Sequence, residues 1–265
     1  MVPVSIVIIT KNEADIIASC IEKARQITDD IVIIDNDSTD ETLEIAGNYG
    51  CRIYKMPWAG YGANKNKGIE AAKYNWILSI DADEVPDDEL ISSIHKLKFN
   101  DAGTVYDIKF RSYFGKKPIR FGSWGRDHHI RMFNREAVKW SETLVHETLL
   151  LPNNVQVKKI KGRLHHYSVK DINEYDSKGS YYAKLSAKKY FKAGKKTNAI
   201  KLYISPLFGF IKNYIVYLGF LDGREGWHIA KTSVKNTRRK YHYLSQMENM
   251  PSKKQAVKDN FVVEY

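Results

Sequence analysis

Two aspartates, Asp81 and Asp83, directly follow the apolar segment WILSI at residues 76–80. With a spacing of i and i+2, both carboxylates project from the same side of a strand, whereas Glu84 would point to the other face. In an open α/β sheet, the carboxyl ends of the strands form the rim where ligands bind. Two carboxylates at that rim suit Mg²⁺ or Mn²⁺ better than Zn²⁺. The alternative is a strand that ends in an acidic turn.

Apolar strands alternate with amphipathic helices through the first hundred residues. The pattern predicts strands at 5–10, 31–35, 52–55 and 76–80, and helices near 16–24, 41–49 and 62–73. Ser38 or Thr39 would cap the second helix, which stops at Gly50. Strands of consecutive apolar residues joined by helices predict a mainly parallel sheet that is buried on both faces.

The carboxyl ends of these strands collect polar side chains that could bind a nucleotide. They are Thr10, Asn12, Glu13, Asp35, Asp37, Asp81 and Asp83. The sequence has no Walker A loop and no GxGxxG motif, so phosphate charge would have to be neutralised by a divalent cation and by Lys or Arg. For Asp37 the alternative is that DNDSTD forms a capped turn before a helix.

Four segments resemble, in order and spacing, the sequential signatures of family 2 glycosyltransferases: VSIVIITKNEA, IDNDSTDET, GYGANKNKGIEAA and LSIDADE. The later segments SETLVHETL, LHHYS and GFLDGREGWHIA are similar to the branch that includes the lipopolysaccharide core glucosyltransferases. The resemblance spans about residues 3–245. It implies an α/β fold of the GT-A type, with a mainly parallel Rossmann-like sheet, a small antiparallel part and a C-terminal helical extension. It also implies a nucleotide-diphosphate sugar donor, favoured as UDP-glucose, a divalent metal and inversion at the anomeric carbon.

The resemblance assigns nucleoside contacts at the ends of the first two strands to Thr10, Asn12, Glu13, Asp35 and Asp37. Lys65, in the helix after a Gly-Tyr-Gly loop, would lie near the base or the phosphates, and a solvated lysine on an exposed face is the alternative. Asp81 would touch the ribose, and Asp83 would bind the cation that bridges the two phosphates. That cation, Mg²⁺ or Mn²⁺, would stabilise the leaving diphosphate.

An inverting transfer needs a base on the acceptor side, because the incoming hydroxyl loses its proton as it attacks. The segment WSETLVHETLL offers candidates, and the resemblance favours Glu147. Glu142 is the reserve candidate, and His146 could orient the acceptor or the base. The structural alternative is a helix cap or a surface turn.

The pair His165 and His166 follows a predicted strand, where side chains alternate in direction, so one of the two can face the site. The resemblance favours His166 as a third metal ligand or a diphosphate contact, and a structural histidine is the alternative. Between the aspartates and these histidines lies a stretch rich in arginines and aromatics. Within it, Arg126 and Arg131 are predicted to contact the donor sugar, the diphosphate or the acceptor.

Positive charge gathers in the second half of the chain. Residues 155–265 hold 23 Lys and Arg against 8 Asp and Glu, which leaves 19 against 23 in residues 1–154. A helix is predicted from Ile172 to Ala193, followed by an apolar segment at 199–223 that Pro206, Lys212 and Asn213 make a poor membrane span. This segment is predicted either to dock on an anionic inner-membrane surface or to pack as a helical hairpin, on the sheet or in a dimer.

The chain is therefore predicted to contain a catalytic domain at 1–170, with a nucleotide-binding half at about 1–100 and an acceptor half at about 101–170. A basic helical extension at 171–245 and a tail at 246–265 would follow. Two cysteines without metal-type spacing, and an N-terminal segment that is predicted to be a strand instead of a signal, favour the cytoplasm.

The predicted activity is transfer of a sugar to a lipopolysaccharide-core or other lipid-linked acceptor. A nucleotidyltransferase and a non-enzymatic binder of anionic surfaces, suggested by the pI of 9.3, are the alternatives. No motif for binding RNA or DNA is present.

Overall fold

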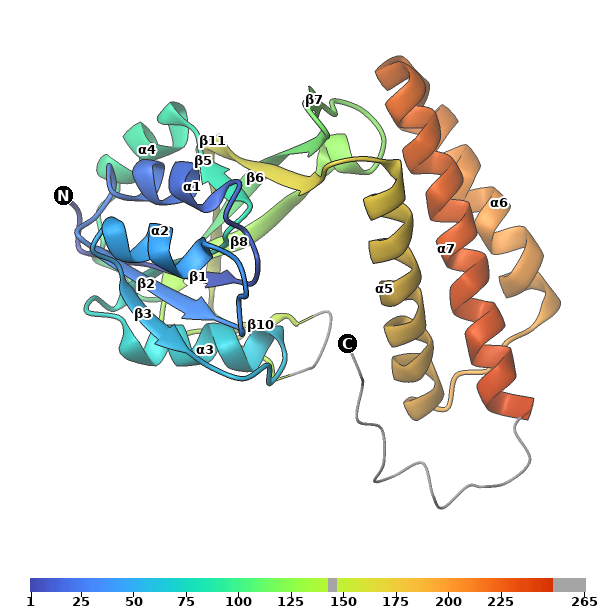
Figure 1. The fold of residues 1–265 in the computed structure, drawn as a ribbon, viewed down its shortest axis with the longest axis horizontal. Helices are drawn as coiled ribbons and strands as arrows, with labels where there is room; N and C mark the ends of the chain where they lie inside the picture. The colour runs from blue at the N-terminus through green and yellow to red at the C-terminus, as the bar shows by residue number, and fades with distance from the viewer. Residues whose placement is uncertain (143–146, 250–265) are drawn as a thin grey trace. The chain divides into compact units, whose positions relative to one another are not determined.

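The computed structural model describes residues 1–142 and 147–249. The chain divides into two compact units, Met1–Lys170 and Asp171–Tyr265. The first unit is an α/β domain and the second is helical (Figure 1). Each unit is described by itself below.

The first unit is built around one large mixed sheet. Its strands follow the order β3-β2-β1-β4-β8-β6-β11-β5, and β7 pairs with β6 off this path. The strands are β1 (Val4–Thr10), β2 (Asp30–Asp35), β3 (Arg52–Lys55), β4 (Trp76–Asp81), β5 (Glu84–Pro86), β6 (Thr104–Phe114), β7 (Lys117–Pro118), β8 (His128–Asn134) and β11 (Gln156–Val169). A separate two-stranded sheet joins β9 (Lys139–Trp140) to β10 (Leu149–Leu150).

Parallel and antiparallel pairing divide the large sheet. Strands β3, β2, β1 and β4 pair in parallel, so their carboxyl ends meet at one edge. Strand β8 then runs antiparallel to both β4 and β6. The predicted mainly parallel sheet with a small antiparallel part is therefore confirmed.

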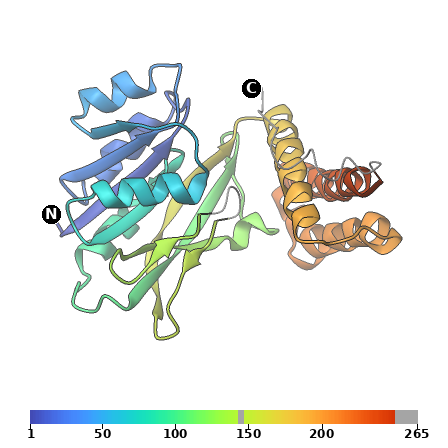
Figure 2. The ribbon, with the colours of Figure 1, turned by 90° about the horizontal axis from the view of Figure 1, so that it is seen from below.

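Helices cover both faces of the parallel strands, as the consecutive apolar residues of those strands require. Helices α1 (Ile17–Ala24), α2 (Thr42–Asn48) and α4 (Asp88–His95) contribute to one buried apolar cluster. Helix α3 (Tyr61–Ala71) contributes to the second cluster, on the opposite face, through Ile69. These helices flank the sheet in Figure 2.

The predicted cap of the second helix is wrong. Helix α2 has Glu41 at its N-cap and no side-chain cap hydrogen bond. Ser38 Oγ instead accepts a hydrogen bond from the backbone N–H of Asn12, and Asn12 Oδ1 accepts one from the backbone N–H of Thr39. A contact with a loop 26 residues away along the chain thus overrides the local capping signal.

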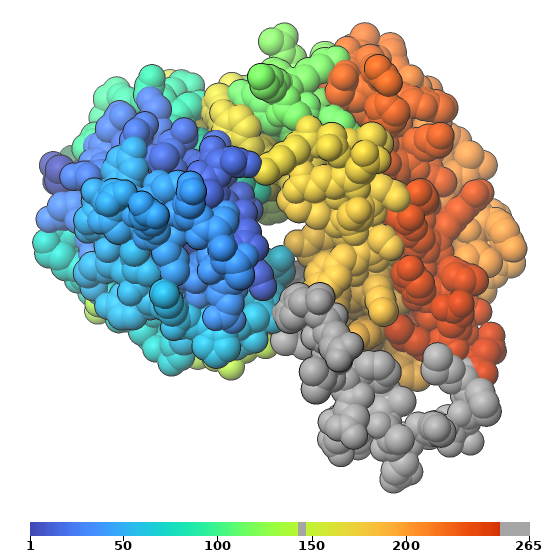
Figure 3. Space-filling view, viewed as in Figure 1, coloured from blue at the N-terminus to red at the C-terminus, as the bar shows by residue number. Residues whose placement is uncertain are grey.

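The second unit begins with α5 (Ile172–Lys192), whose first turn is capped by Asp171. Helix α7 (Gly223–Asn249) packs beside it (Figure 3), and the carboxylate of Asp176 on α5 binds both Lys235 and Arg239 of α7. Because α7 continues to Asn249, residues 246–249 are helical, where the tail was predicted to begin.

The apolar segment of this unit forms one helical stretch from Ile200 to Val216, composed of η2 (Ile200–Ile204), α6 (Ser205–Phe210) and η3 (Ile211–Val216). A short helix, η4 (Gly219–Asp222), joins it to α7. Within the described ranges, no single helix has the length and hydropathy of a membrane span. The stretch Ile200–Val216 passes that test only together with Gly219–Asn249, from which it is bent by 69°.

We expect Gly68→Ala to destabilise the first unit by about 1–3 kcal/mol through overpacking. A Cβ at Gly68 would lie 2.3 Å from Val7 Cγ1 and 2.9 Å from Ile34 Cγ1, where α3 approaches the sheet most closely. The free energy of unfolding, from urea denaturation, checks this. Gly47→Ala on α2 is the matched control, because a Cβ there meets nothing within 4 Å, and we expect no loss of stability. Equal losses in both variants would contradict the close approach of α3.

Candidate active site

The carboxyl edge of the parallel strands holds two buried oxygens that lack a partner. Thr10 ends β1 and lies beside Asp35, which ends β2. Thr10 Oγ1 and Asp35 Oδ1 are buried and have no hydrogen-bond partner among the described residues. Since an unpaired buried polar atom costs about 1–3 kcal/mol, both oxygens suit a ligand that supplies the missing bonds.

The loops beyond these strands bind each other. Asn12 and Asp37 both have left-handed backbones, with φ of 55° and 60°. The amide oxygen of Asn12 accepts a hydrogen bond from the loop that follows β2, whereas Asp37 is exposed at the same edge. The structure therefore gives Asn12 a role in shaping the loop. Glu13 lies next to it, and its backbone N–H donates to Thr42 Oγ1 at the start of α2.

Lys65 lies at the centre of a buried charge cluster. Its Nζ is 2.9 Å from Glu147 Oε1 and 3.1 Å from Asp81 Oδ1, and the side chain is 1% exposed. The ammonium also lies 4.7 Å from the ring centroid of Trp140. The alternative of a solvated lysine is therefore wrong, and the predicted base Glu147 and the predicted ribose ligand Asp81 share one cation.

Helix α3 reaches this position because it docks tightly on β9. The side chain of Asn66 donates to the backbone oxygen of Trp140 and accepts from its backbone N–H. A Cβ at Gly62 would lie 1.9 Å from the backbone oxygen of Ser141, so the Gly-Tyr-Gly segment permits the close approach. The docking turns Lys65 inward between strand β4 and the segment that carries Glu147.

A second buried ion pair, between Arg131 and Glu84, lies next to Asp81. Arg131, on β8, binds the carboxylate of Glu84, and its Nη2 is 3.5 Å from Asp81 Oδ2. Burial raises the pKa of Asp81, but the charges of Lys65 and Arg131 outweigh it and hold that pKa at about 2. Asp81 is consequently an anion across the physiological pH range.

The strand pattern predicted that Glu84 points to the opposite face from Asp81, and this prediction is wrong. Its Oε2 accepts a hydrogen bond from the backbone N–H of Asp81 at 3.1 Å, and its side chain is buried. The reason is that β4 ends at Asp81, so the strand alternation does not continue through the turn to Glu84, where β5 begins. Burial raises the pKa of Glu84 to about 7, against the opposing effect of Arg131.

Asp83 lies in the turn beyond β4 and faces His166. Asp83 Oδ2 is 3.4 Å from His166 Nε2, and the backbone oxygen of Asp83 accepts a hydrogen bond from the backbone N–H of Tyr167. Although burial lowers the pKa of His166, Asp83 raises it to about 9. The antiparallel pairing of β11 with β5, which sets His166 opposite Glu84, fixes this geometry.

An oxygen donor from Asp83 and a nitrogen donor from His166 fit a divalent cation that takes its other ligands from substrate phosphates and water. No group of three or more His, Cys, Asp or Glu side chains able to hold a metal ion occurs in residues 1–142 and 147–249. If a cation binds here together with a nucleotide, Asp83 and His166 would supply part of its coordination sphere.

His165 takes different partners from its neighbour. Its Nδ1 is 2.9 Å from the hydroxyl of Tyr113, and its Nε2 is 3.9 Å from Asp87. Burial lowers the pKa of His165, and the positive charges of Arg111 and Arg163 lower it further, against Asp87. His165 therefore lies in a positive environment.

That environment is a cavity of about 750 Å³, which we call the basic pocket. It is lined from β6, β8, β11 and the segment around η1 (Trp124–Arg126), and its cationic lining residues are Lys109, Arg111, Arg120, Arg126 and Arg163. Arg126, predicted to contact the donor sugar, the diphosphate or the acceptor, lies in this lining, which does not include the buried Arg131. Of the acceptor-side candidates, Glu142 is exposed, and His146 lies outside the described residues.

The family model for glycosyl transferase family 2 matches residues 5–148. This chain belongs to glycosyl transferase family 2. The predicted GT-A-type fold is thereby confirmed, and the protein is an enzyme of the glycosyltransferase class. The match contains every member of the Lys65 cluster named above and Asp83, but ends before His166.

Relatives that match over most of this chain are also described as glycosyltransferases. An uncharacterized glycosyltransferase of Rickettsia typhi is 30% identical over 238 residues, which cover 86% of this chain and 81% of the relative. One from Rickettsia prowazekii is 29% identical with the same coverage. A solved structure of glucosyl-3-phosphoglycerate synthase from Mycobacterium tuberculosis, in complex with Mn²⁺, UDP-glucose and phosphoglyceric acid, is 21% identical with a TM-score of 0.35. That match covers 43% of this chain and 45% of the other.

Sequence reasoning missed three features of the glycosyltransferase site. These are the bridge that Lys65 makes, the inward turn of Glu84 and the basic pocket. The pocket left a signal in the sequence, because Lys109, Arg111 and Tyr113 alternate along one strand. The Lys65 bridge and the inward turn of Glu84 left no such signal. They depend on the Lys65–Glu147 and Arg131–Glu84 contacts, which join residues 82 and 47 positions apart in the chain.

We expect Lys65→Met to lower the free energy of unfolding by about 3 kcal/mol, because it leaves Asp81 and Glu147 without their shared buried cation. Urea denaturation measures the loss. Lys67→Met, two residues along the same helix, is the control: Lys67 is 54% exposed and pairs with Glu70 at the surface, so its loss should change stability by at most about 0.5 kcal/mol. Similar values for the two variants would show that the bridge contributes no more than a surface pair.

Proposed function

We propose that this glycosyltransferase moves glucose from UDP-glucose to a lipopolysaccharide-core or other lipid-linked glycan, with inversion at the anomeric carbon. The observation that carries the proposal is the position of the Lys65 bridge. It joins the carboxylates of Glu147 and Asp81 through one ammonium group, and Asp83, two residues after Asp81, faces His166. A donor-side carboxylate, a cation site and an acceptor-side base are the parts that an inverting transfer needs.

The donor's nucleoside would bind at the carboxyl edge. The unpaired oxygens of Thr10 and Asp35 are hydrogen-bond acceptors, and Thr10 can also donate, which suits uracil and ribose. Glu13 and Asp37 lie in the loops at the same edge. Asp81, held ionised by Lys65 and Arg131, would accept from a ribose hydroxyl.

The donor's diphosphate would lie at Asp83 and His166, which would hold Mg²⁺ or Mn²⁺. When bound, the cation supplies Lewis-acid stabilisation of the diphosphate leaving group. Asp83 and His166, which face each other at 3.4 Å, would hold the cation through a carboxylate oxygen and a neutral imidazole nitrogen.

Glu147 would act as the general base. Lys65 binds its Oε1 and fixes the direction of the carboxylate, and Oε2 is the oxygen that would accept the proton. The acceptor hydroxyl loses this proton as its oxygen attacks the anomeric carbon, while the bond from that carbon to the diphosphate breaks. The side chain of Glu147 is 15% exposed, so an acceptor can reach it.

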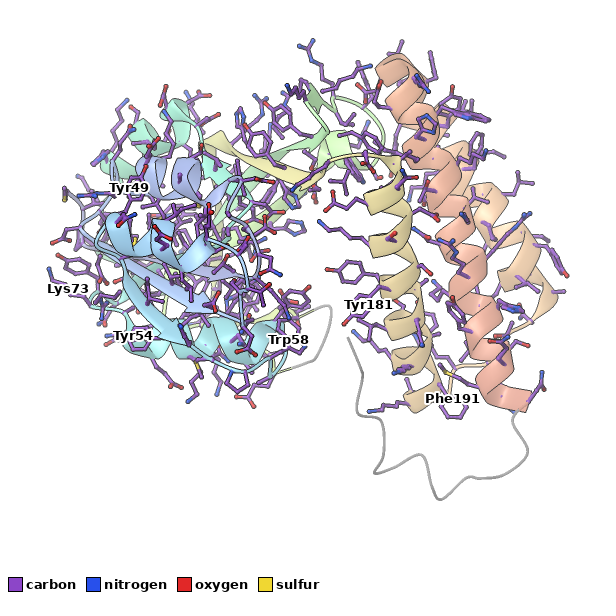
Figure 4. All side chains as sticks on the ribbon, in the orientation of Figure 1. Tyr49, Tyr54, Trp58, Lys73, Tyr181 and Phe191 are labelled. Atoms are coloured by element: carbon purple, nitrogen blue, oxygen red, sulfur yellow. The ribbon has the colours of Figure 1, made fainter. Side chains whose placement is uncertain are left out.

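A membrane-facing acceptor is supported by the helical unit. Its stretch from Ile200 to Leu221 exposes large apolar side chains to solvent, among them Tyr203, Leu207 and Phe208 at 58–65% exposure. Lys201 and Lys212 lie in the same stretch, and α5 adds the exposed aromatics Tyr181 and Phe191 (Figure 4). Apolar side chains with interspersed lysines are typical of helices that lie in an anionic lipid surface. We therefore propose peripheral contact with the cytoplasmic face of the inner membrane.

We expect UDP to bind in a Mn²⁺-dependent manner, and Asp83→Ala to abolish the dependence on metal. Glu147→Gln should keep this binding and lower sugar transfer at least about 100-fold, because the amide cannot accept the proton. Calorimetry with and without Mn²⁺ measures the first effect, and release of UDP in the presence of acceptor measures the second. Glu142→Gln is the control for the base and should retain activity. Release of pyrophosphate instead of UDP would identify a nucleotidyltransferase.

We expect the full chain to float with vesicles that contain anionic lipid, and the double variant Leu207→Ser/Phe208→Ser to lose most of this binding. The loss follows from removing two exposed apolar side chains that would insert among the lipids. Tyr54→Ser, which removes an exposed aromatic of the first unit, is the control and should float like the wild type. Unchanged flotation of the double variant would refute the membrane contact through this stretch.

A further inference from the structure

Glu84 and Arg131 form a buried ion pair that touches Asp81 at two points. Glu84 Oε1 binds Arg131 Nη2, and Glu84 Oε2 accepts a hydrogen bond from the backbone N–H of Asp81 at 3.1 Å. The same Nη2 lies 3.5 Å from Asp81 Oδ2. The side chains of Glu84 and Arg131 are 1% and 9% exposed, so both depend on protein partners to compensate their charges. Arg131 therefore has two carboxylates within reach and binds that of Glu84.

Strand pairing places the two members of this pair independently. Arg131 is on β8, two residues before Phe133, which pairs with Ile77 of β4. Asp81 lies four residues after Ile77, so the alternation of side chains sets Asp81 and Arg131 on the same face of the sheet. Glu84 begins β5, which pairs with β11 instead. The carboxylate and the guanidinium thus reach Asp81 from different strands.

The carboxylate of Asp81 keeps the capacity to accept hydrogen bonds. Lys65 Nζ lies 3.1 Å from Oδ1, yet Oδ1 has no hydrogen bond of regular geometry from the described residues. The 3.5 Å between Oδ2 and Arg131 exceeds the length of a charge-assisted hydrogen bond, about 2.8 Å. The side chain of Asp81 is 30% exposed, so a ligand can reach it. Asp81 is consequently both charged and open, while Glu84 occupies the guanidinium beside it.

A guanidinium that lost Glu84 would turn to Asp81. Removal of one partner from a buried ion pair leaves an uncompensated charge, which is strongly unfavourable. Asp81 is the other carboxylate within 4 Å of Arg131 among the residues that the structure describes. Because arginine binds carboxylates in a bidentate manner, this contact would occupy the oxygens that Asp81 offers to a ligand. The negative charge of Glu84 therefore decides whether Asp81 is available.

We propose that Glu84 is a positioning residue for the donor, which holds Arg131 off the carboxylate of Asp81 and so leaves that carboxylate open to a ribose hydroxyl. The inference rests on the proposed function, in which Asp81 accepts a hydrogen bond from the ribose. It adds to that function a residue that acts through Arg131, without touching the donor itself.

The test is calorimetric titration of the full chain, in the presence of Mn²⁺, with UDP, 2′-deoxy-UDP and 3′-deoxy-UDP. We expect the wild type to bind UDP at least about tenfold more tightly than the analogue that lacks the hydroxyl bound by Asp81, because a hydrogen bond to a charged group is lost. Glu84→Gln keeps an oxygen for the N–H of Asp81 but releases Arg131. It should weaken UDP binding about tenfold and reduce the discrimination to less than about threefold. Glu70→Gln, which removes a 65% exposed carboxylate paired with Lys67, is the control and should behave like the wild type.

A double variant separates positioning from a loss of structure. In Glu84→Gln/Arg131→Gln no guanidinium remains to close on Asp81, and both members of the buried ion pair are neutral. We expect its discrimination against the deoxy analogue to return to within about threefold of the wild type. A merely structural role would lower the stability of Glu84→Gln in urea and leave its discrimination unchanged. That result would overturn the inference, and so would loss of discrimination in the double variant, whether or not Glu84→Gln folds.

Failure of the proposed function gives a different pattern. A wild type that does not bind UDP refutes the proposed donor, and the inference falls with it. A wild type that binds UDP and both deoxy analogues equally refutes the ribose contact of Asp81, and again the inference falls, while UDP remains the ligand. A wild type that discriminates, beside a Glu84→Gln variant that discriminates equally, overturns the inference alone.

Discussion

The buried ammonium of Lys65 is the interaction on which the rest of the site depends. A charge in this position has to be compensated, because its removal from water costs several kcal/mol. The carboxylates of Asp81 and Glu147 compensate it, at 3.1 and 2.9 Å. In return, the lysine keeps Asp81 ionised and holds the carboxylate of Glu147 in one orientation. One side chain on α3 thus links Asp81, the proposed ribose contact, to Glu147, the proposed base.

Neighbouring ion pairs continue the alternation of positive and negative groups that Lys65 and its two carboxylates begin. Arg131 lies between Glu84 and Asp81, and His166 faces Asp83, so positive and negative groups alternate along the carboxyl edge of β4. Such a network contributes less to stability than a hydrophobic core of equal volume. The network fixes positions: each carboxylate has a defined partner before any substrate binds. A preorganised site loses less free energy in ordering its groups on binding.

Three surfaces of the protein are chemically distinct. The carboxyl edge of the parallel strands offers unpaired oxygens to a nucleoside, the basic pocket offers guanidinium groups, and the helical stretch from Ile200 to Leu221 offers apolar side chains. A nucleotide-sugar is the proposed ligand of the first surface, and a lipid surface is the proposed partner of the third. The proposed transfer would use the first of these surfaces for the donor's nucleoside and the third for contact with lipid.

The sequence by itself determined the family, the order of strands and helices and the acidic pair at the end of β4. These features are local: apolar periodicity defines each element, and the ordered motifs occupy the loops that follow the strands. The predicted bounds of β3 agree with the structure, and those of β1, β2 and β4 differ by one residue at one end. Parallel pairing then brings Thr10, Asp35 and Asp81 to one edge without further information.

Tertiary structure alone decided which charges meet. The sequence left two interpretations of Lys65 open, a contact with the base or the phosphates and a solvated lysine on an exposed face. The hydrogen bonds of Asn66 with Trp140 dock α3 so that Lys65 points inward. Glu84 does not follow strand alternation because β4 has already ended, and Arg131, predicted to contact the donor sugar, the diphosphate or the acceptor, lies against the buried carboxylates of Glu84 and Asp81. The physical reason is common to all three. The environment of an ionisable side chain is set by groups distant along the chain, and local sequence carries no record of which of them will fold beside it.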